Sequence, residues 1–190
     1  MVSWARMIAT FSRVSGRFGV NPREAERFFK FMVVGAIGFV VDFGLFNLLT
    51  GPFDLLLEVG APLYNMLVGT GLEPSLVILL APTFAGTISF IAAIISNFLW
   101  NRYWTYPDSR SKSPRRQFVM FLLVSIAGIL IRVPIITFLH GPLEALFGQI
   151  VVLEPYAERL GENAALAIAV IIVLFWNFFA NRYWTYSDVE

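Results

Sequence analysis

The sequence contains no cysteine and only one histidine. Without cysteine, disulfide frameworks, thiolate nucleophiles and cysteine-bound metal centres are excluded. His140 has no second histidine as a companion and is a poor metal ligand, and the Gly141-Pro142 pair beside it predicts a loop residue at a helix end. We therefore expect neither a metal site nor a cofactor.

Charged residues are also scarce. Asp, Glu, Lys and Arg make up 14% of the chain, against about 25% in ordinary soluble proteins, and 57% of the residues are hydrophobic. The formal net charge is only +1, and no nucleic-acid partner is expected. No glycine-rich phosphate loop, nucleophile with a paired base or cluster of acids is visible. These absences favour a membrane protein that is not an enzyme.

Four apolar runs are long enough to cross a bilayer, whose ~30 Å hydrocarbon core needs about 20 helical residues. They cover residues 28–50, 75–100, 118–139 and 163–180. Their spacing predicts an all-α membrane protein in which four transmembrane helices form two hairpins.

The charges are segregated between the connections. Arg and Lys precede the first run and fill the loop between the second and third, whereas the two other connections are mainly acidic. The positive-inside rule then places both termini in the cytoplasm and the chain in the inner (cytoplasmic) membrane. The expected organisation is an interfacial amphipathic segment at 1–26, a first transmembrane hairpin at 27–106, a basic cytoplasmic linker at 107–116 and a second hairpin at 117–190. For the first segment a frayed tail is the alternative.

The two hairpins are related by a sequence repeat. The segment NFLWNRYWTY at 97–106 returns as NFFANRYWTY at 177–186, with eight of ten positions identical. Aligning residue 28 with residue 118 also matches Gly38 with Gly128. Because each hairpin begins and ends on the same side, a parallel repeat about an axis along the membrane normal is expected.

Two charges lie inside the apolar runs at matching repeat positions. Asp42 and Arg132 each follow the predicted helix start by about 21 Å, at 1.5 Å per residue, so they should lie at similar depth. An isolated charge in hydrocarbon is costly, and a pair across the bundle makes both tolerable. The pair is interpreted either as a polar step for a substrate or as a structural ion pair. Pro134 should free a backbone carbonyl near Arg132.

The duplicated segment supplies the second group of candidates. Its asparagines are four residues apart on one helix face, and amides facing lipid would be unsatisfied, which favours an inward role. Its arginines suit a phosphate, although snorkelling arginines in an aromatic belt are the alternative. For its four tyrosines, at 103, 106, 183 and 186, the belt is favoured. The candidates are Asn97, Asn101, Arg102 and Trp104 in the first copy and Asn177, Asn181, Arg182 and Trp184 in the second.

Together, these motifs resemble the GtrA-like family of small four-helix membrane proteins of cell-surface polysaccharide assembly. The resemblance spans residues 28–186 and is carried by KFMVVGAIG at 30–38, Asp42, both duplicated segments and the basic linker. It implies a protein that moves polyprenyl-phosphate-linked sugars across the bilayer or assists the glycosyltransferases that make them. Tyr106 and Tyr186 stand where many relatives are expected to have phenylalanine.

Three hypotheses follow. The first is a translocase in which Arg102 and Arg182 capture the lipid phosphate and Asp42 and Arg132 form an internal step. The second is a partner that recruits or stabilises a membrane glycosyltransferase without transport. The third is a proton-coupled exporter of small molecules, which a carboxylate held by an arginine disfavours. Four helices enclose little volume, so the substrate is expected to cross at a groove that faces the membrane lipids or at the interface of a homodimer, and not through a closed channel.

Overall fold

The computed structural model describes residue 10 and residues 21–189 of the chain. Of the amphipathic segment predicted for residues 1–26, residues 1–9 and 11–20 lie outside this part. The described residues form two compact units, the first ending at Thr105 and the second beginning at Tyr106. Each unit is a helical hairpin.

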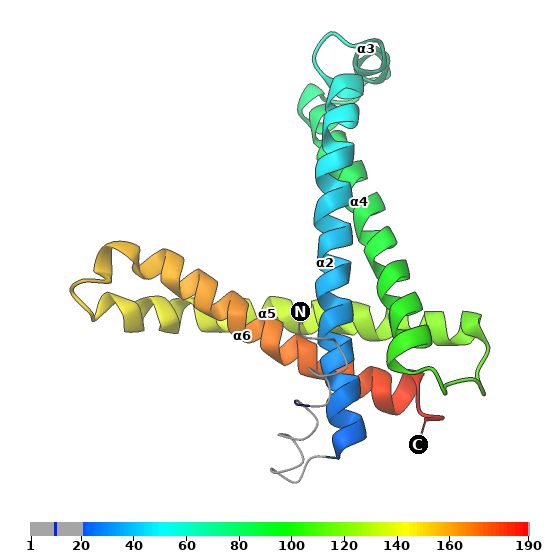
Figure 1. Ribbon diagram of the computed structural model, residues 1–190. Helices are drawn as coiled ribbons and strands as arrows, with labels where there is room; N and C mark the ends of the chain where they lie inside the picture. Colours follow the sequence, from blue (N-terminus) through cyan, green and yellow to red (C-terminus); the bar gives the residue numbers. More distant parts are fainter. Residues whose placement is uncertain (1–9, 11–20, 190) are drawn as a thin grey trace. The chain divides into compact units, whose positions relative to one another are not determined.

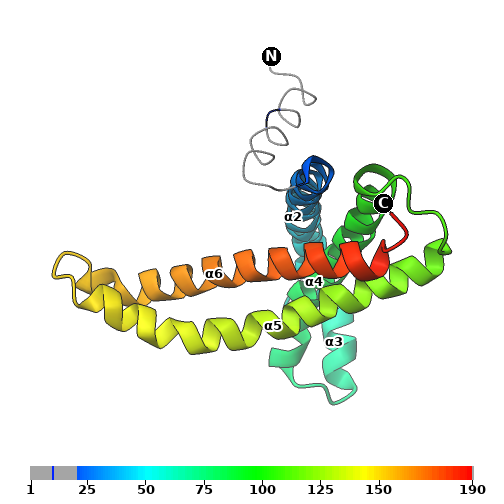
Figure 2. The same cartoon turned by 90° about the horizontal axis from the view of Figure 1, so that it is seen from below.

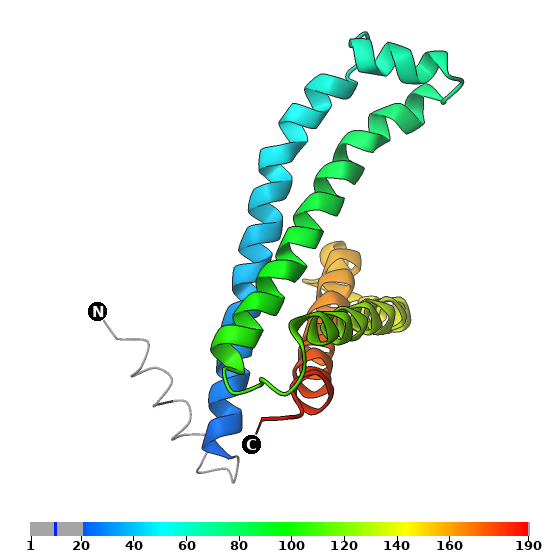
Figure 3. The same ribbon diagram turned by 90° about the vertical axis from the view of Figure 1, so that its right-hand side faces the viewer.

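In the first unit, α2 (Pro22–Leu57) and α4 (Pro74–Trp100) run side by side (Figures 1 and 3). Asn21 caps α2, because its Oδ1 accepts a hydrogen bond from the backbone N–H of Arg23 at 2.9 Å. The connection contains a further helix, α3 (Pro62–Gly69), that the sequence did not predict. Glycines with positive φ stand before and after it, Gly60 at 95° and Gly71 at 96°.

A small apolar cluster closes the α3 end of this unit. Leu57, Tyr64, Val77 and Ala81 are buried there against one another. Tyr64 of α3 therefore packs between the end of α2 and the start of α4 and holds them together.

The second unit consists of α5 (Pro114–Gly148), the short 3-10 turn η2 (Glu154–Tyr156) and α6 (Ala157–Ala180). Figure 2 shows α5 and α6 lying side by side along most of their length. The Ser113 side chain caps α5 by accepting from the N–H of Arg116 at 3.4 Å.

Small residues let the two helices of each unit approach closely. On α4 every fourth residue is buried, namely Val77, Ala81, Ala85, Ser89 and Ala93. The corresponding face of α6 contains Gly161, where an added Cβ would lie only 2.8 Å from the backbone nitrogen of Glu144 in α5.

The long helices extend beyond the predicted runs. Both first helices continue through a Gly-Pro pair, Gly51-Pro52 in α2 and Gly141-Pro142 in α5. The prediction that His140 is a loop residue is therefore wrong: His140 is helical, and its Nε2 lies 3.6 Å from Oε2 of Glu144. Proline is tolerated inside long apolar helices because neighbouring groups can satisfy the carbonyl it frees, so Gly-Pro did not mark an end here.

Within the part of the chain that the structure describes, four helical segments are long and apolar enough to cross a membrane: Pro22–Leu57, Pro74–Thr105, Pro114–Gly148 and Glu154–Thr185. This confirms the four predicted spans. Their orientation and the parallel-repeat relation between the hairpins stay predictions.

Candidate functional site

Both copies of the sequence NRYWT form one turn of π-helix at the end of a long α-helix. These turns are η1 (Asn101–Thr105), which follows α4, and η3 (Asn181–Thr185), which follows α6. Single π turns are rare in proteins as a whole, but many of those known lie at functional sites. The wider turn redirects side chains and changes the hydrogen-bond partners of the backbone groups. The sequence repeat marked the segment, but nothing in its composition indicated a π turn.

The first asparagine of each copy packs against a glycine of the neighbouring helix. In the first unit Asn97 contacts Gly38 of α2 so closely that a Cβ added to the glycine would overlap the amide. In the second unit the equivalent pair is Asn177 and Gly128 of α5, where an added Cβ would lie 3.2 Å from Nδ2. The inward role predicted for these asparagines agrees with this geometry within each unit.

Amide oxygens at the site remain open to a hydrogen-bond donor. The Oδ1 atoms of Asn97, Asn101 and Asn177 are buried and accept no hydrogen bond from any described residue. Asn181 differs, since its Oδ1 accepts from Thr185 Oγ1 at 2.8 Å and its Nδ2 donates to the carbonyl of Asn177 at 2.8 Å. Buried polar groups normally have partners, so three acceptors of this kind suit water or the hydroxyl groups of a ligand.

The arginines of the motif lie over aromatic rings. The guanidinium of Arg102 is 5.9 Å from the centroid of Tyr103, and that of Arg182 is 5.6 Å from Tyr183. Arg102 is only 5% exposed, whereas Arg182 is half-buried. A guanidinium is attracted to the electron-rich face of an aromatic ring, and its N–H donors suit an anion.

The tryptophans have different neighbours in the two copies. Trp104 packs edge-on against Trp100 at 6.0 Å, and the ammonium of Lys30 lies 5.9 Å from its ring. Lys30 belongs to the same site and was not among the sequence candidates, although its place in the KFMVVGAIG segment was a usable signal. In the second copy, the backbone carbonyl of Trp184 instead accepts from Lys112 Nζ at 2.7 Å.

Two of the tyrosines do not lie in an exposed aromatic belt. Tyr106 and Tyr186 are 0% exposed, and their rings stack with centroids 4.4 Å apart. The prediction of an aromatic belt is therefore wrong for Tyr106 and Tyr186. These last residues of the two duplicated segments stack on each other inside the second unit. Tyr103 and Tyr183 are 59% and 67% exposed, as a belt requires.

The basic linker is fastened to the C-terminal segment of its own unit. Asp188 accepts hydrogen bonds from Ser109 Oγ at 2.6 Å and from the N–H and Oγ of Ser111 at 2.8 and 2.7 Å. Lys112 Nζ donates to the carbonyl of Thr185 at 3.2 Å. Burial raises the pKa of Asp188, but the hydrogen bonds from Ser109 and Ser111 outweigh it and hold the pKa well below its usual range.

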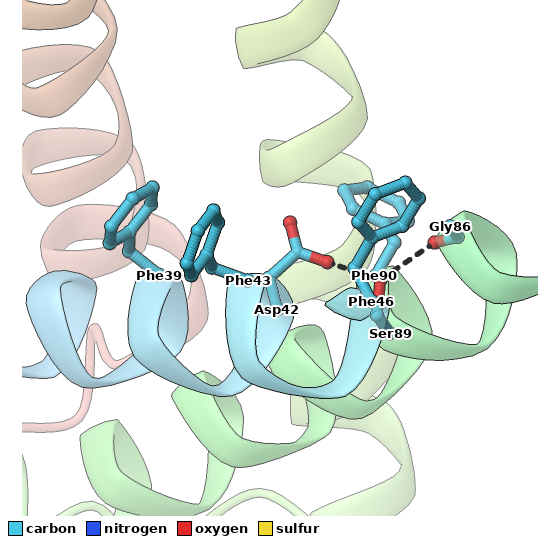
Figure 4. Close-up of a pocket in the computed structure, with 7 residues that line it drawn as sticks. All are labelled: Phe39, Asp42, Phe43, Phe46, Gly86, Ser89 and Phe90. Atoms are coloured by element: carbon cyan, nitrogen blue, oxygen red, sulfur yellow. Dashed lines mark hydrogen bonds between the residues drawn. The ribbon is translucent and has the colours of Figure 1, made fainter. Parts of the chain in front are cut away.

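The two membrane charges lie in different units. In the first unit, Asp42 Oδ1 accepts a hydrogen bond from Ser89 Oγ of α4 at 2.6 Å (Figure 4). In the second unit, Arg132 is an exposed residue of α5. The Asp42–Arg132 pair stays a prediction, and Ser89 is a partner of Asp42 that the sequence did not identify. Among the described residues no group of three His, Asp or Glu side chains could hold a metal ion.

Comparison with known proteins gives the chain its family. It is 26% identical over 182 residues to the uncharacterized membrane protein YngA of Bacillus subtilis (strain 168), a match that covers 96% of this chain and 94% of YngA. Residues 30–186 match the family described as "GtrA/DPMS, transmembrane domain", a range that contains both π turns, the linker and all four spans except residues 22–29 of the first. The chain therefore belongs to the GtrA family of multi-pass membrane proteins, which is linked to polyprenyl-sugar translocation.

Proposed function

We propose that this protein translocates a polyprenyl-phosphate-linked sugar across the cytoplasmic membrane for cell-surface glycan assembly. The observation that carries the proposal is the duplicated π turn, in which an asparagine and an arginine stand in the last turn of a membrane-spanning segment in each unit. The family supports the same context, since it is associated with translocation and is generally non-catalytic.

The arginines are the proposed phosphate ligands. A phosphate monoanion or diester at the membrane boundary needs charged hydrogen-bond donors, and guanidinium groups bind its oxygens in a two-pronged geometry. The guanidinium groups of Arg102 and Arg182 lie 5.9 and 5.6 Å from the ring centroids of Tyr103 and Tyr183, a contact that limits their conformational freedom before the ligand arrives. Pre-ordering of this kind lowers the entropy cost of binding.

The asparagines and tryptophans are proposed to serve the polar part of the substrate. The free Oδ1 atoms of Asn97, Asn101 and Asn177 accept from hydroxyl groups or from water that solvates them, and Asn181 orients Asn177 through its backbone carbonyl. Trp104 and Trp184, each in the π turn of its own unit, present aromatic surface to the sugar. Asp42 and Arg132 are proposed as the internal polar step.

A second candidate function is recruitment of a membrane glycosyltransferase. The linker is ordered by a hydrogen bond from the Ser111 N–H to Asp188 and by one from Lys112 to the carbonyl of Thr185. This order favours recruitment, because it leaves Arg115 and Arg116 exposed at the start of α5 as a fixed basic surface. A docking role of this kind requires no lipid-phosphate contact at the π turns.

Binding of the lipid tests the phosphate assignment. Arg102→Lys with Arg182→Lys keeps the charge but loses the planar two-pronged contact, so affinity for polyprenyl-phosphate glucose should fall by about 1–3 kcal/mol. Insertion and thermal stability should stay normal, because the positive-inside signal is unchanged. The matched control is Arg115→Lys with Arg116→Lys, which alters two exposed arginines outside the π turns. Equal affinity in the wild type and the Arg102/Arg182 variant would favour recruitment.

A further inference from the structure

The first unit contains a pocket between α2 and α4 that surrounds Asp42. Its volume is about 420 Å³, within the ~300–1,000 Å³ usual for small-molecule sites. Figure 4 shows the Asp42 carboxylate rising from α2 beside the rings of Phe39 and Phe43. The lining residues are Phe39, Asp42, Phe43, Phe46, Gly86, Ser89 and Phe90.

The polar groups of the pocket are few and are held in place. Ser89 is 1% exposed, and its Oγ lies 2.6 Å from Asp42 Oδ1 and 3.1 Å from the carbonyl of Gly86. One carboxylate oxygen is therefore fixed by a short hydrogen bond, and Figure 4 shows the other directed away from Ser89. A carboxylate with one oxygen available is an acceptor for hydroxyl groups.

The remaining lining is aromatic. Phe39 and Phe43 stack on each other with centroids 5.9 Å apart, and Phe46 and Phe90 complete the wall. A pyranose ring has a face of C–H groups that packs on aromatic rings and an edge of hydroxyl groups that needs acceptors. Aromatic faces beside one fixed carboxylate match both requirements.

The second unit does not repeat the residues that line this pocket. In the sequence repeat, the four phenylalanines of the pocket align with Ile129, Val133, Ile136 and Val170 of the second unit. Asp42 and Ser89, which are hydrogen-bonded in the first unit, align with Arg132 and Ala169. The Gly–Asn contact, by contrast, is present in both units. The duplicated hairpins thus share their packing contact and differ at every lining residue of this pocket, as expected for a site needed once per chain.

We propose that this pocket is the subsite for the sugar of the lipid-linked substrate, with Asp42 accepting from its hydroxyl groups and the phenylalanines packing on its C–H face. The inference rests on the proposed function, since it concerns the same substrate. It adds that α2 and α4 bind the sugar at a different stage of transport from the capture of the phosphate by the arginines of the π turns, because Arg102 follows Ser89 by 13 residues, about 20 Å along a helix.

Two lipids separate these roles. The full chain, purified in lipid nanodiscs, is titrated with polyprenyl phosphate that carries no sugar and with polyprenyl phosphates that carry glucose, mannose, arabinose or N-acetylglucosamine. The variants are Asp42→Asn and Phe90→Leu. The matched control is Phe84→Leu, which removes another exposed ring of α4 that packs on Phe53 outside the pocket.

The wild type should bind at least one sugar-carrying lipid more tightly than the sugar-free lipid. Asp42→Asn and Phe90→Leu should each weaken that binding on the order of tenfold and leave the sugar-free lipid unchanged, whereas Phe84→Leu should change neither. Thermal unfolding of each variant checks that the hairpin is intact.

The inference is overturned if no sugar lipid binds more tightly than the sugar-free lipid. It is also overturned if the pocket variants weaken both lipids equally, because the pocket then holds a part that both lipids share, such as the polyprenyl chain. In either case a loss of sugar-free lipid binding in the Arg102/Arg182 variant would still support the phosphate site of the proposed function. Failure of the wild type to bind any of these lipids would instead refute the proposed function itself.

Discussion

The contact between Gly38 and Asn97 predicts a large and specific effect of one added methyl group. In the structure, a Cβ on Gly38 overlaps the Asn97 amide, and the amide is held between α2 and α4. Gly38→Ala must therefore push the helices apart or rotate the asparagine. Overpacking of this kind costs about 1–3 kcal/mol in a well-packed core.

Three comparisons isolate this clash. Gly35 lies on the same helix with nothing within 4 Å of an added Cβ, so Gly35→Ala should be neutral or slightly stabilising. Gly128→Ala places its Cβ 3.2 Å from Asn177 Nδ2 and from a methyl group of Val173, so it should cost less than Gly38→Ala. Combining Gly38→Ala with Asn97→Ala removes the overlapping atoms and should recover much of the lost stability.

Thermal unfolding in a fixed lipid or detergent mixture measures these differences. The expected order of stability, from highest to lowest, is Gly35→Ala, Gly128→Ala and Gly38→Ala, with the double variant above Gly38→Ala alone. If Gly38→Ala is as stable as Gly35→Ala, or if the double variant is the least stable, the Gly–Asn contact is not formed as described.

Three further outcomes are expected. Asp42→Ala or Arg132→Ala alone should lower the folded yield in membranes. If the two side chains pair, the exchange Asp42→Arg with Arg132→Asp should recover much of that yield, whereas an exchange as damaging as both single changes together would show that they do not meet. Because the pKa of Asp188 is depressed, the stabilisation that its carboxylate gives to the linker is present above the ordinary aspartate pKa of about 4 and is lost as pH falls below it. At neutral pH, Asp188→Asn should therefore speed hydrogen exchange of the Ser111 amide, and unchanged exchange would contradict the assigned hydrogen bonds. Accessibility reporters should place Ser111 in the cytoplasm and Glu58 outside, and an external Ser111 would refute the predicted orientation.

Hydropathy located the four membrane helices but not their ends. Their ~20-residue apolar runs are a long-range compositional signal, whereas the ends depend on caps such as Asn21 and Ser113 and on tolerance of Pro52 and Pro142 inside a helix. A Gly-Pro pair marks a helix end in soluble proteins more reliably than in a membrane helix, which is why the extensions of α2 and α5 were missed.

The sequence repeat identified the residues of the candidate site, but it did not predict the contacts that these residues make. Duplication of NRYWT singled out the asparagines and arginines, because an identical polar segment at two span ends is unusual in an apolar chain. The π turns, the Tyr106–Tyr186 stack and the Ser89 hydrogen bond to Asp42 depend on helix register, and residues 47 apart in sequence have no local pattern that links them.

Transport itself is the central claim, and it is measured most directly with the purified chain in sealed vesicles. Polyprenyl-phosphate glucose is placed in both leaflets, and an impermeant enzyme outside the vesicles then modifies every sugar that it can reach. The account predicts that vesicles with the wild-type chain expose nearly all of the sugar while vesicles with the Arg102→Lys, Arg182→Lys variant expose it much more slowly. Exposure of only the outer-leaflet half, as in vesicles without protein, would contradict translocation and leave recruitment as the function.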